Sequence, residues 1–204
     1  MWRKNSLIKI TVAGLCFAFA GELANAQQVF SANWSTYVGG EVDPDRVNAI
    51  ASDSHTNLFI GGFLGQGNIL NNQEISSTTT FQGVRDGFVA RITNQGELDW
   101  YTCLGGAQND SIMGVSLSTN GTVYAAGFSG IDVLQEEKGT YAILSALDGT
   151  SGSSKDGWPV SIGEANTTNG FNAVAVDAAG YIYAVGYTTQ TNLTAYGTAH
   201  PGST

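Results

Sequence analysis

The 204-residue sequence contains few basic residues, and this shortage excludes several classes of partner. Lysine and arginine total eight against seventeen aspartates and glutamates, which gives a formal net charge of −9. A protein that binds duplex nucleic acid needs clustered Lys and Arg side chains to neutralise phosphates, and anionic membrane surfaces attract the same side chains. The sequence has no such cluster. It therefore predicts no nucleic-acid partner and disfavours anionic membranes.

The apolar runs are also short, and the first of them has the pattern of a secretory signal peptide. Its positively charged n-region is formed by Arg3, Lys4 and Lys9. An apolar run over 10–20 follows, and Ala24-Asn25-Ala26 supplies the small-x-small site that signal peptidase needs. The run is too short to span a bilayer as a helix. We expect residues 1–26 to be a signal peptide cleaved after Ala26, which leaves a secreted or cell-surface chain with no transmembrane span.

Cysteine is almost absent. Cys16 lies in the signal peptide, and Leu15 precedes it where a lipoprotein signal has a small residue, so cleavage leaves Cys103 alone. The mature chain would have five basic and sixteen acidic residues, a net charge of −11. A single thiol forms no internal disulfide, so we expect stability to come from packing. Cys103 lies in the strand-like run W-Y-T-C-L, which predicts a buried apolar residue rather than a reactive thiol.

Catalytic and cofactor motifs are missing as well. The sequence contains no G-x-S-x-G, no H-E-x-x-H, no Walker or Rossmann glycine pattern and no sialidase Asp box. His55 and His200 lie in polar, turn-like stretches that are far apart in the repeat described below. The sequence therefore predicts no catalytic residue, no cofactor and no metal ligand.

Three stretches of the chain repeat one pattern instead. Each begins with a tryptophan segment (W-S-T-Y-V-G-G, W-Y-T-C-L-G-G or W-P-V-S-I-G-E) that starts at Trp34, Trp100 or Trp158. Each continues to a glycine after an apolar strand (N-L-F-I-G-G-F, T-V-Y-A-A-G-F or Y-I-Y-A-V-G-Y). The separation from tryptophan to glycine is 28, 27 and 28 residues, ending at Gly62, Gly127 and Gly186.

Each unit is predicted to contain about four short strands. V-N-A-I-A-S-D, M-G-V-S-L-S-T and N-A-V-A-V-D-A alternate at period two and run into turns where Asn or Gly supplies positive φ. Apolar spacing of three and four residues, typical of helices, is absent. Four-stranded units of this size stack radially as propeller blades. We expect an all-β fold, a β-propeller in 27–204, with units over about 34–99 and 100–157 and an incomplete unit over 158–204.

The same motifs resemble the SBBP repeat, a bacterial β-propeller repeat. W-S-T-Y-V-G-G and D-G-F-V-A-R-I-T match its characteristic strands, and the recurrent glycines and aspartates fall at its structural positions. Matching residues include Gly39, Gly40, Asp53, Gly62, Asp86, Phe88, Val89, Ala90, Arg91, Gly105, Gly106, Asp110, Gly121, Gly127, Asp177, Gly180 and Gly186. The resemblance covers nearly all of 30–204. It implies an exported or surface-associated bacterial protein, generally without assigned catalysis.

The sequence departs from that pattern in two ways. Ser118 stands where the other units have aspartate, and Tyr141-Ala142-Ile143 replaces Asp-Ala-Phe. In addition, the chain stops one residue before the aspartate that would open its last strand, and three units are fewer than propellers typically need to close a ring. We expect a truncated or fragmentary propeller with an unpaired strand edge.

Several acidic and aromatic clusters have a structural interpretation beside a functional one. Asp43 and Asp45 lack the ligand spacing of a calcium loop, so a solvated turn is favoured. Asp53 and Asp177 precede hairpin turns and are predicted to bond their own backbone amides. The run over 146–158 faintly resembles a quinoprotein tryptophan-docking repeat, but a turn between strands explains it. The repeated tryptophans are expected to pack between blades rather than to stack on sugars.

These patterns favour a non-catalytic, exported or cell-surface propeller that serves binding, adhesion or structural display. Its ligand, a protein or a carbohydrate, is expected to contact the variable loops Gly65 to Thr80 and Gln190 to Pro201. The alternative is the N-terminal part of an extracellular hydrolase, lyase or quinoprotein whose catalytic residues lie beyond residue 204. A third hypothesis is a non-functional remnant that folds poorly.

Overall fold

The regular structure of the chain consists of strands. The computed structural model describes residues 8–13, 32–39, 44–65, 76–77, 81–130 and 139–191, and no helix occurs in these ranges. The predicted all-β class is therefore confirmed. The strands are β1 (Ile8–Ala13), β2 (Ala32–Val38), β3 (Arg46–Ser52), β4 (Leu58–Leu64), β5 (Ser76–Ser77), β6 (Asp86–Ile92), β7 (Leu98–Leu104), β8 (Asp110–Leu117), β9 (Thr122–Gly130), β10 (Thr140–Asp148), β11 (Val160–Ile162), β12 (Asn169–Val176) and β13 (Ile182–Thr188).

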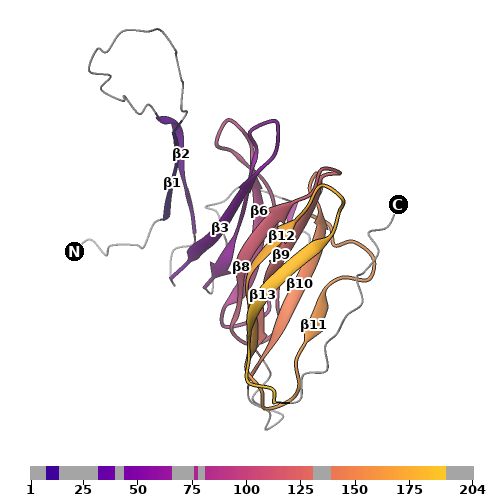
Figure 1. Ribbon diagram of the computed structural model, residues 1–204. Helices are drawn as coiled ribbons and strands as arrows, with labels where there is room; N and C mark the ends of the chain where they lie inside the picture. Colours follow the sequence, from indigo (N-terminus) through magenta and orange to yellow (C-terminus); the bar gives the residue numbers. More distant parts are fainter. Residues whose placement is uncertain are drawn as a thin grey trace, which may run out of the picture.

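Most strands belong to antiparallel sheets in which chain neighbours pair (Figure 1). The first sheet has the order β3-β4-β6-β7, with the two-residue β5 added parallel to β7. The second sheet has the order β11-β10-β9-β8, and β12 and β13 form a third sheet of two strands. Strands β1 and β2 pair separately. Units of four antiparallel strands are thus present as predicted.

The sheets and the sequence repeat are out of phase by one strand. Trp100 opens a unit of the repeat, yet its strand β7 pairs with β6 and forms the last main strand of the first sheet. Likewise β11, which follows Trp158, pairs with β10 at the edge of the second sheet. The sequence repeat therefore gives the number of residues per unit. The hydrogen bonding between strands shows that the three sheets begin at β3, β8 and β12.

A β-bulge recurs at one position of these three opening strands. The register shifts fall between Val47 and Ala49, between Ile112 and Gly114, and between Phe171 and Ala173. A glycine stands opposite each bulge, because an added Cβ would overlap the carbonyl oxygen of the bulged strand. These glycines are Gly62, Gly127 and Gly186. The last glycine of each repeat is therefore required by a close backbone approach at a bulge.

Aspartate side chains organise two of the hairpin turns, as the sequence predicted. Asp53 accepts hydrogen bonds from the backbone N–H groups of His55 and Asn57, at 2.8 and 2.9 Å. Asp177 accepts equivalent bonds from the N–H groups two and four residues later, both at 2.9 Å. Where the second unit lacks the aspartate, the Ser118 hydroxyl accepts the bond from the Thr122 N–H at 3.1 Å. Local side-chain acceptors thus close all three turns.

One detail of the turn prediction is wrong. In the S-H-T-N turn the positive φ falls on Thr56, at 63°, and not on the asparagine. Asn57 instead donates its side-chain amide to the Asp53 carboxylate at 2.8 Å, which closes the turn just before β4. In the other two turns glycine supplies the positive φ as predicted, at Gly121 and Gly180.

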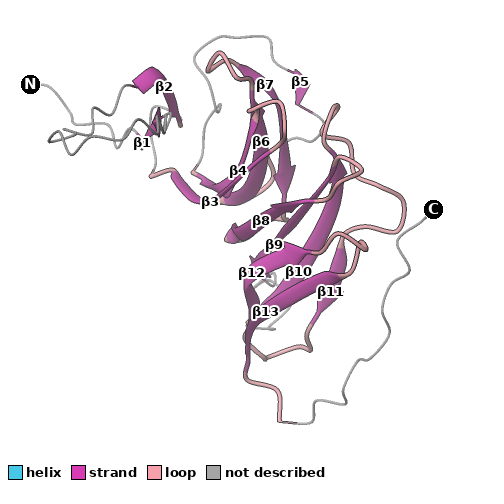
Figure 2. Cartoon of the chain, turned by 45° about the horizontal axis from the view of Figure 1, so that its top comes forward, coloured by secondary structure: helices cyan, strands magenta, loops and turns pink. Residues whose placement is uncertain are grey.

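The sheets lie face to face in chain order, with β8 between β3 and β12 (Figure 2). A buried apolar cluster fills the space between the first and second sheets: Phe59, Val89, Trp100, Leu104, Ile112, Val115, Val123, Ala125, Ile143 and Leu147. An added Cβ at Gly61 would lie 2.6 and 2.7 Å from methyl groups of Val115 and Ile112. Small residues therefore allow neighbouring sheets to approach closely.

Trp100 fills the space between these two sheets. Its ring centroid lies 6.1 Å from that of Phe59, and its Nε1 donates to the Gly149 carbonyl oxygen at 3.2 Å. Trp34 takes a similar place beside the first sheet, where its indole faces Gly96 of the β6–β7 turn as that of Trp100 faces Gly152. Packing of a tryptophan between neighbouring sheets, which was expected for all three, is therefore observed for Trp100.

The other face of the first sheet contacts β2. Val38 of β2 belongs to a second buried cluster with Leu58, Ile60, Leu64, Phe88, Ala90 and Ile92. Strand β2 thus lies against the first sheet much as β7 lies against the second. Its pairing partner β1 falls inside the segment assigned from the sequence to the signal peptide.

Candidate functional site

The buried carboxylates hold loops in place. Asp86 and Asp110 are each 1% exposed. Asp86 accepts hydrogen bonds from the N–H groups of residues 82 and 83 at 2.8 and 2.9 Å, and Asp110 accepts them from Gly106 and Gly130 at 2.9 and 3.1 Å. Three of these bonds join a strand to a neighbouring loop, and the bond from Gly130 joins β8 to the last residue of β9. These aspartates are therefore structural residues of the repeat.

Asp45 differs from the sequence-based expectation. A solvated turn was expected for Asp43 and Asp45; residue 43 lies outside the described ranges, while Asp45 is half-buried. Its carboxylate accepts a hydrogen bond from the Gly65 N–H, 20 residues away, at 2.9 Å. The position just before β3 matches that of Asp110 at the start of β8, so Asp45 ties the end of β4 to the start of its own sheet.

The carboxylates divide into two electrostatic groups. Burial raises the pKa of Asp110 to about 6, and burial also raises the pKa of Asp86. Burial alone would raise the pKa of Asp53, but hydrogen bonds from Asn57 and His55 lower it below its usual value. The backbone bond from Tyr181 likewise lowers the pKa of Asp177. Raised pKa values thus occur at buried loop anchors, and lowered ones at exposed turns.

Cys103 is buried, as predicted, with 7% of its surface exposed. Burial raises the pKa of its thiol to about 12. The thiolate is the reactive form of cysteine, so the folded protein holds this side chain in an unreactive state. Within the described ranges, no three His, Cys, Asp or Glu side chains gather as a metal site would require.

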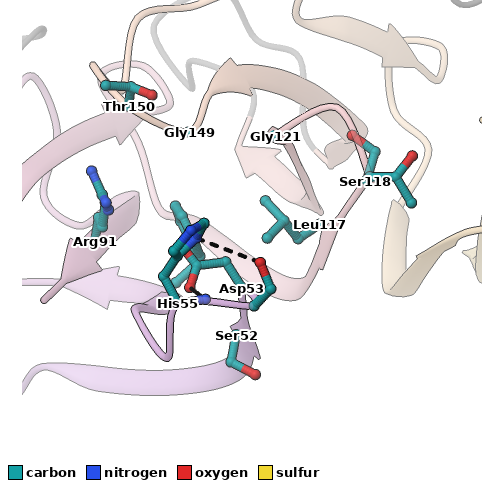
Figure 3. A pocket seen from close by; sticks show the side chains of 12 residues that line it. Ser52, Asp53, His55, Arg91, Leu117, Ser118, Gly121, Gly149 and Thr150 are labelled. Atoms are coloured by element: carbon teal, nitrogen blue, oxygen red, sulfur yellow. Dashed lines mark hydrogen bonds between the residues drawn. The ribbon is translucent and has the colours of Figure 1, made fainter. Parts of the chain in front are cut away.

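A groove opens between the first and second sheets at the end where their hairpin turns lie (Figure 3). Its volume is about 650 Å³. The turns β3–β4, β8–β9 and β10–β11 contribute to its rim, and Arg91 of β6 reaches its wall. The lining residues are Ser52, Asp53, Ser54, His55, Phe59, Arg91, Leu117, Ser118, Thr119, Gly121, Gly149 and Thr150.

Arg91 is the main cation of this groove. Its Nη1 donates to Asp99 Oδ2 at 2.8 Å, and its guanidinium carbon lies 6.0 Å from the Phe59 ring centroid. The Nε of Arg91 is buried and has no hydrogen-bond partner in the structure. A buried donor without a partner costs folding free energy unless water or a ligand accepts its bond. The Arg91 side chain as a whole is 21% exposed and lines the groove, whereas its Nε is enclosed.

His55 does not form a catalytic arrangement with its neighbours. Its Nδ1 lies 3.5 Å from the hydroxyl of Ser54, and both residues are exposed in one turn. The nearby carboxylate of Asp53 accepts backbone N–H bonds at Oδ1 and the Asn57 side-chain amide at Oδ2, so both of its oxygens are engaged within the turn. The groove offers hydroxyls and one guanidinium, a set suited to hydrogen bonding with a polar ligand.

The sequence pattern predicted ligand binding at other loops. Most of the loop Gly65 to Thr80 and of the segment Gln190 to Pro201, including His200, lies outside the described residues. The turns around the groove were identified as turns, yet nothing in their local sequence indicated that three of them converge. Only the face-to-face placement of two sheets brings residues near 53, 118 and 150 together.

Comparison with known proteins adds no identity: no family model matches the chain, and no curated protein does. Among the described residues, no helix has the length and apolar character needed to cross a bilayer.

Proposed function

We propose that this chain is part of a β-propeller of the SBBP-like type. Support comes from antiparallel sheets that stack face to face in chain order and from opening strands that lie side by side. The bulge and its facing glycine recur at the same position of three successive sheets. Radial stacking of such units is the architecture that this combination favours.

We further propose that the protein is exported and acts in binding rather than in catalysis. The observation that carries this proposal is the inter-sheet groove, which the Arg91 side chain lines together with the hydroxyl side chains of the turns. The aspartates at the turns and strand ends accept hydrogen bonds from backbone N–H groups, so we assign them a structural role rather than a catalytic one. The ligand class that fits is a hydroxyl-rich one, a carbohydrate first, because its oxygens would accept hydrogen bonds from Arg91 and its hydroxyls would bond to the hydroxyl side chains that line the groove.

Ligand binding can be tested on a glycan array, followed by calorimetry with the best glycan. The Arg91→Met variant removes the groove donor and should weaken binding at least tenfold. Arg85→Met is the matched control, because Arg85 lies over the Phe63 ring at 4.4 Å and does not line the groove. Equal losses in both variants, or no glycan bound by the wild-type protein, would contradict the assignment of the groove to carbohydrate.

Export can be tested separately. The full 204-residue sequence is expressed in a bacterial host, and the N-terminus of the product outside the cytoplasm is sequenced. We expect it to begin at Gln27, as the cleavage pattern predicts. A product that stays in the cytoplasm with residues 1–26 attached would disprove the signal peptide.

A further inference from the structure

The third sheet exposes an apolar face. Tyr181, Tyr183, Val185 and Tyr187 of this sheet and its turn are 58%, 56%, 62% and 44% exposed. Along β13 the last three alternate with residues of the opposite face, so their side chains share one side of the sheet. We name this set the trailing face. A row of exposed aromatic and branched side chains of this kind marks an interaction surface.

The repeat shows what covers such a face. Aligned on Gly62, Gly127 and Gly186, the trailing-face position Tyr183 corresponds to Phe59 of β4 and to Tyr124 of β9. Phe59 is 2% exposed and Tyr124 is 8% exposed, because the next sheet packs over each of them. The equivalent residue is therefore buried in both sheets that have a successor among the described residues.

The contacts of these covered faces come from the opening strand of the following sheet. Gly61, the equivalent of Val185, faces Val115 and Ile112 of β8. In the next interface, Gly114 of β8 approaches the backbone of Ala173 and Val174 in β12. In both interfaces the covering strand is therefore the opening strand of the following sheet, β8 over the first sheet and β12 over the second. It presents the branched residue Val115 in the first interface, and Val174 stands at the equivalent position in the second.

The bulge supplies a second, polar contact. Asn48, the bulge residue of β3, donates its side-chain amide to the Ile112 carbonyl oxygen at 2.8 Å and to the Ser111 hydroxyl at 3.1 Å. Both acceptors belong to β8 of the following sheet. Asn172 occupies the same bulge position in β12 and is exposed. The third sheet therefore carries the apolar and the polar half of an interface.

The complementary half lies at the other end of the described array. Ile50 of β3 is the equivalent of Val115, yet it is 56% exposed whereas Val115 is 9% exposed. It belongs to β3, the opening strand of the first sheet. The equivalent opening strands β8 and β12 each cover the sheet that precedes them. We name Ile50 and its strand β3 the leading edge.

We propose that the trailing face of one copy of this chain binds the leading edge of a second copy, head to tail. The new interface would continue the one that joins β3 to β8 and β8 to β12, with Ile50 against Val185 as Val115 lies against Gly61. The interface is heterologous, so it generates rings or open filaments rather than a two-fold dimer. It is independent of any ligand in the groove.

Single blocking variants test this proposal through mass measurement by analytical ultracentrifugation. The protein is purified after expression of the full sequence, and the wild type should self-associate as its concentration rises. Val185→Asp removes the trailing face and Ile50→Asp removes the leading edge, so each variant alone should be monomeric. Mixed together, they should form a one-to-one dimer, because one variant keeps an intact trailing face and the other an intact leading edge.

Val84→Asp is the matched control. Val84 is 66% exposed in a loop and belongs to neither surface, so this variant should associate as the wild type does. Far-UV circular dichroism verifies that each variant folds, which exposed positions permit. A wild type that stays monomeric at about 100 µM, roughly a hundred times a micromolar dissociation constant, would overturn the proposal. A mixture that stays monomeric would overturn it too, as would an isologous dimer that only one of the two variants disrupts.

Discussion

The residue that opens each sheet is a loop anchor, and its chemistry varies between units. Asp45 and Asp110 present carboxylates to backbone N–H groups, whereas Asn169 stands at the same position of β12. Asn169 accepts from the Thr188 hydroxyl at 2.6 Å and donates to the Thr140 carbonyl oxygen at 2.9 Å. An amide therefore fills this position without a titrating group.

This comparison predicts a pH effect for Asp110→Asn. The folded pKa of Asp110, about 6, lies above its ordinary value of 3.8. Its protonation therefore stabilises the fold below the unfolded pKa, and this contribution is lost as pH rises through 6. Relative to pH 7, the wild type should gain about 1 kcal/mol at pH 5 from this residue, and the variant should not.

Urea denaturation of both proteins at pH 5 and pH 7 measures the difference. The quantity to compare is the change in unfolding free energy with pH, so a constant offset between the two proteins does not matter. Identical pH dependence in wild type and variant would show that Asp110 titrates normally. The total pH dependence includes other carboxylates, which the subtraction removes.

At the scale of the strand, the bulge decides which residue reaches the neighbouring sheet. The extra residue in β3 turns the Asn48 amide toward β8, and the same irregularity in β12 leaves Asn172 exposed. Asn48→Ala removes the donor for the Ile112 carbonyl oxygen and should lower the unfolding free energy by about 1–2 kcal/mol. Asn172→Ala should change it by about 0.5 kcal/mol or less.

Chemical denaturation at submicromolar protein concentration compares the two variants without interference from self-association. Asn48 and Asn172 share residue type, strand position and bulge, but among the described residues a following sheet packs against Asn48 alone. A loss in Asn172→Ala as large as that in Asn48→Ala would assign the effect to the bulge itself rather than to the contact between sheets.

At the scale of the whole molecule, each described sheet is stabilised by its neighbours. The first and second sheets share one apolar cluster, and Trp100 joins them through its ring and through its bond to Gly149. Stability of stacked units is then the sum of their own stability and of the interfaces between neighbours. Loss of one interface should therefore weaken the whole array.

Trp100→Ala should lower the unfolding free energy by about 3–5 kcal/mol, because it empties a site that is 2% exposed between two sheets. Trp158→Ala is the comparison. Trp158 is half-buried and its ring meets that of Tyr124 edge-on at 6.0 Å, so its removal should cost less than half as much. Urea titrations followed by circular dichroism measure both changes. Equal losses would disprove a special role for the Trp100 interface.

The sequence by itself determined the strands and the repeat, because these depend on local chemistry. Period-two alternation, the aspartates before the turns and the recurrent glycines act over a few residues and are visible in the chain. The roles of Asp53 and Asp177 follow from their positions just before hairpin turns, since each carboxylate bonds amides only a few residues away. The burial of Cys103 followed from the apolar character of its own strand.

Tertiary structure alone decided what depends on residues far apart in sequence. Strand pairing placed Trp100 at the end of one sheet, although it begins a unit of the repeat. The link from Asp45 to Gly65 and the groove beside Arg91 require segments separated by about 20 to 100 residues to meet. Such long-range contacts depend on backbone hydrogen bonding between strands and on burial between sheets. The local sequence of one strand does not determine which surface packs against it.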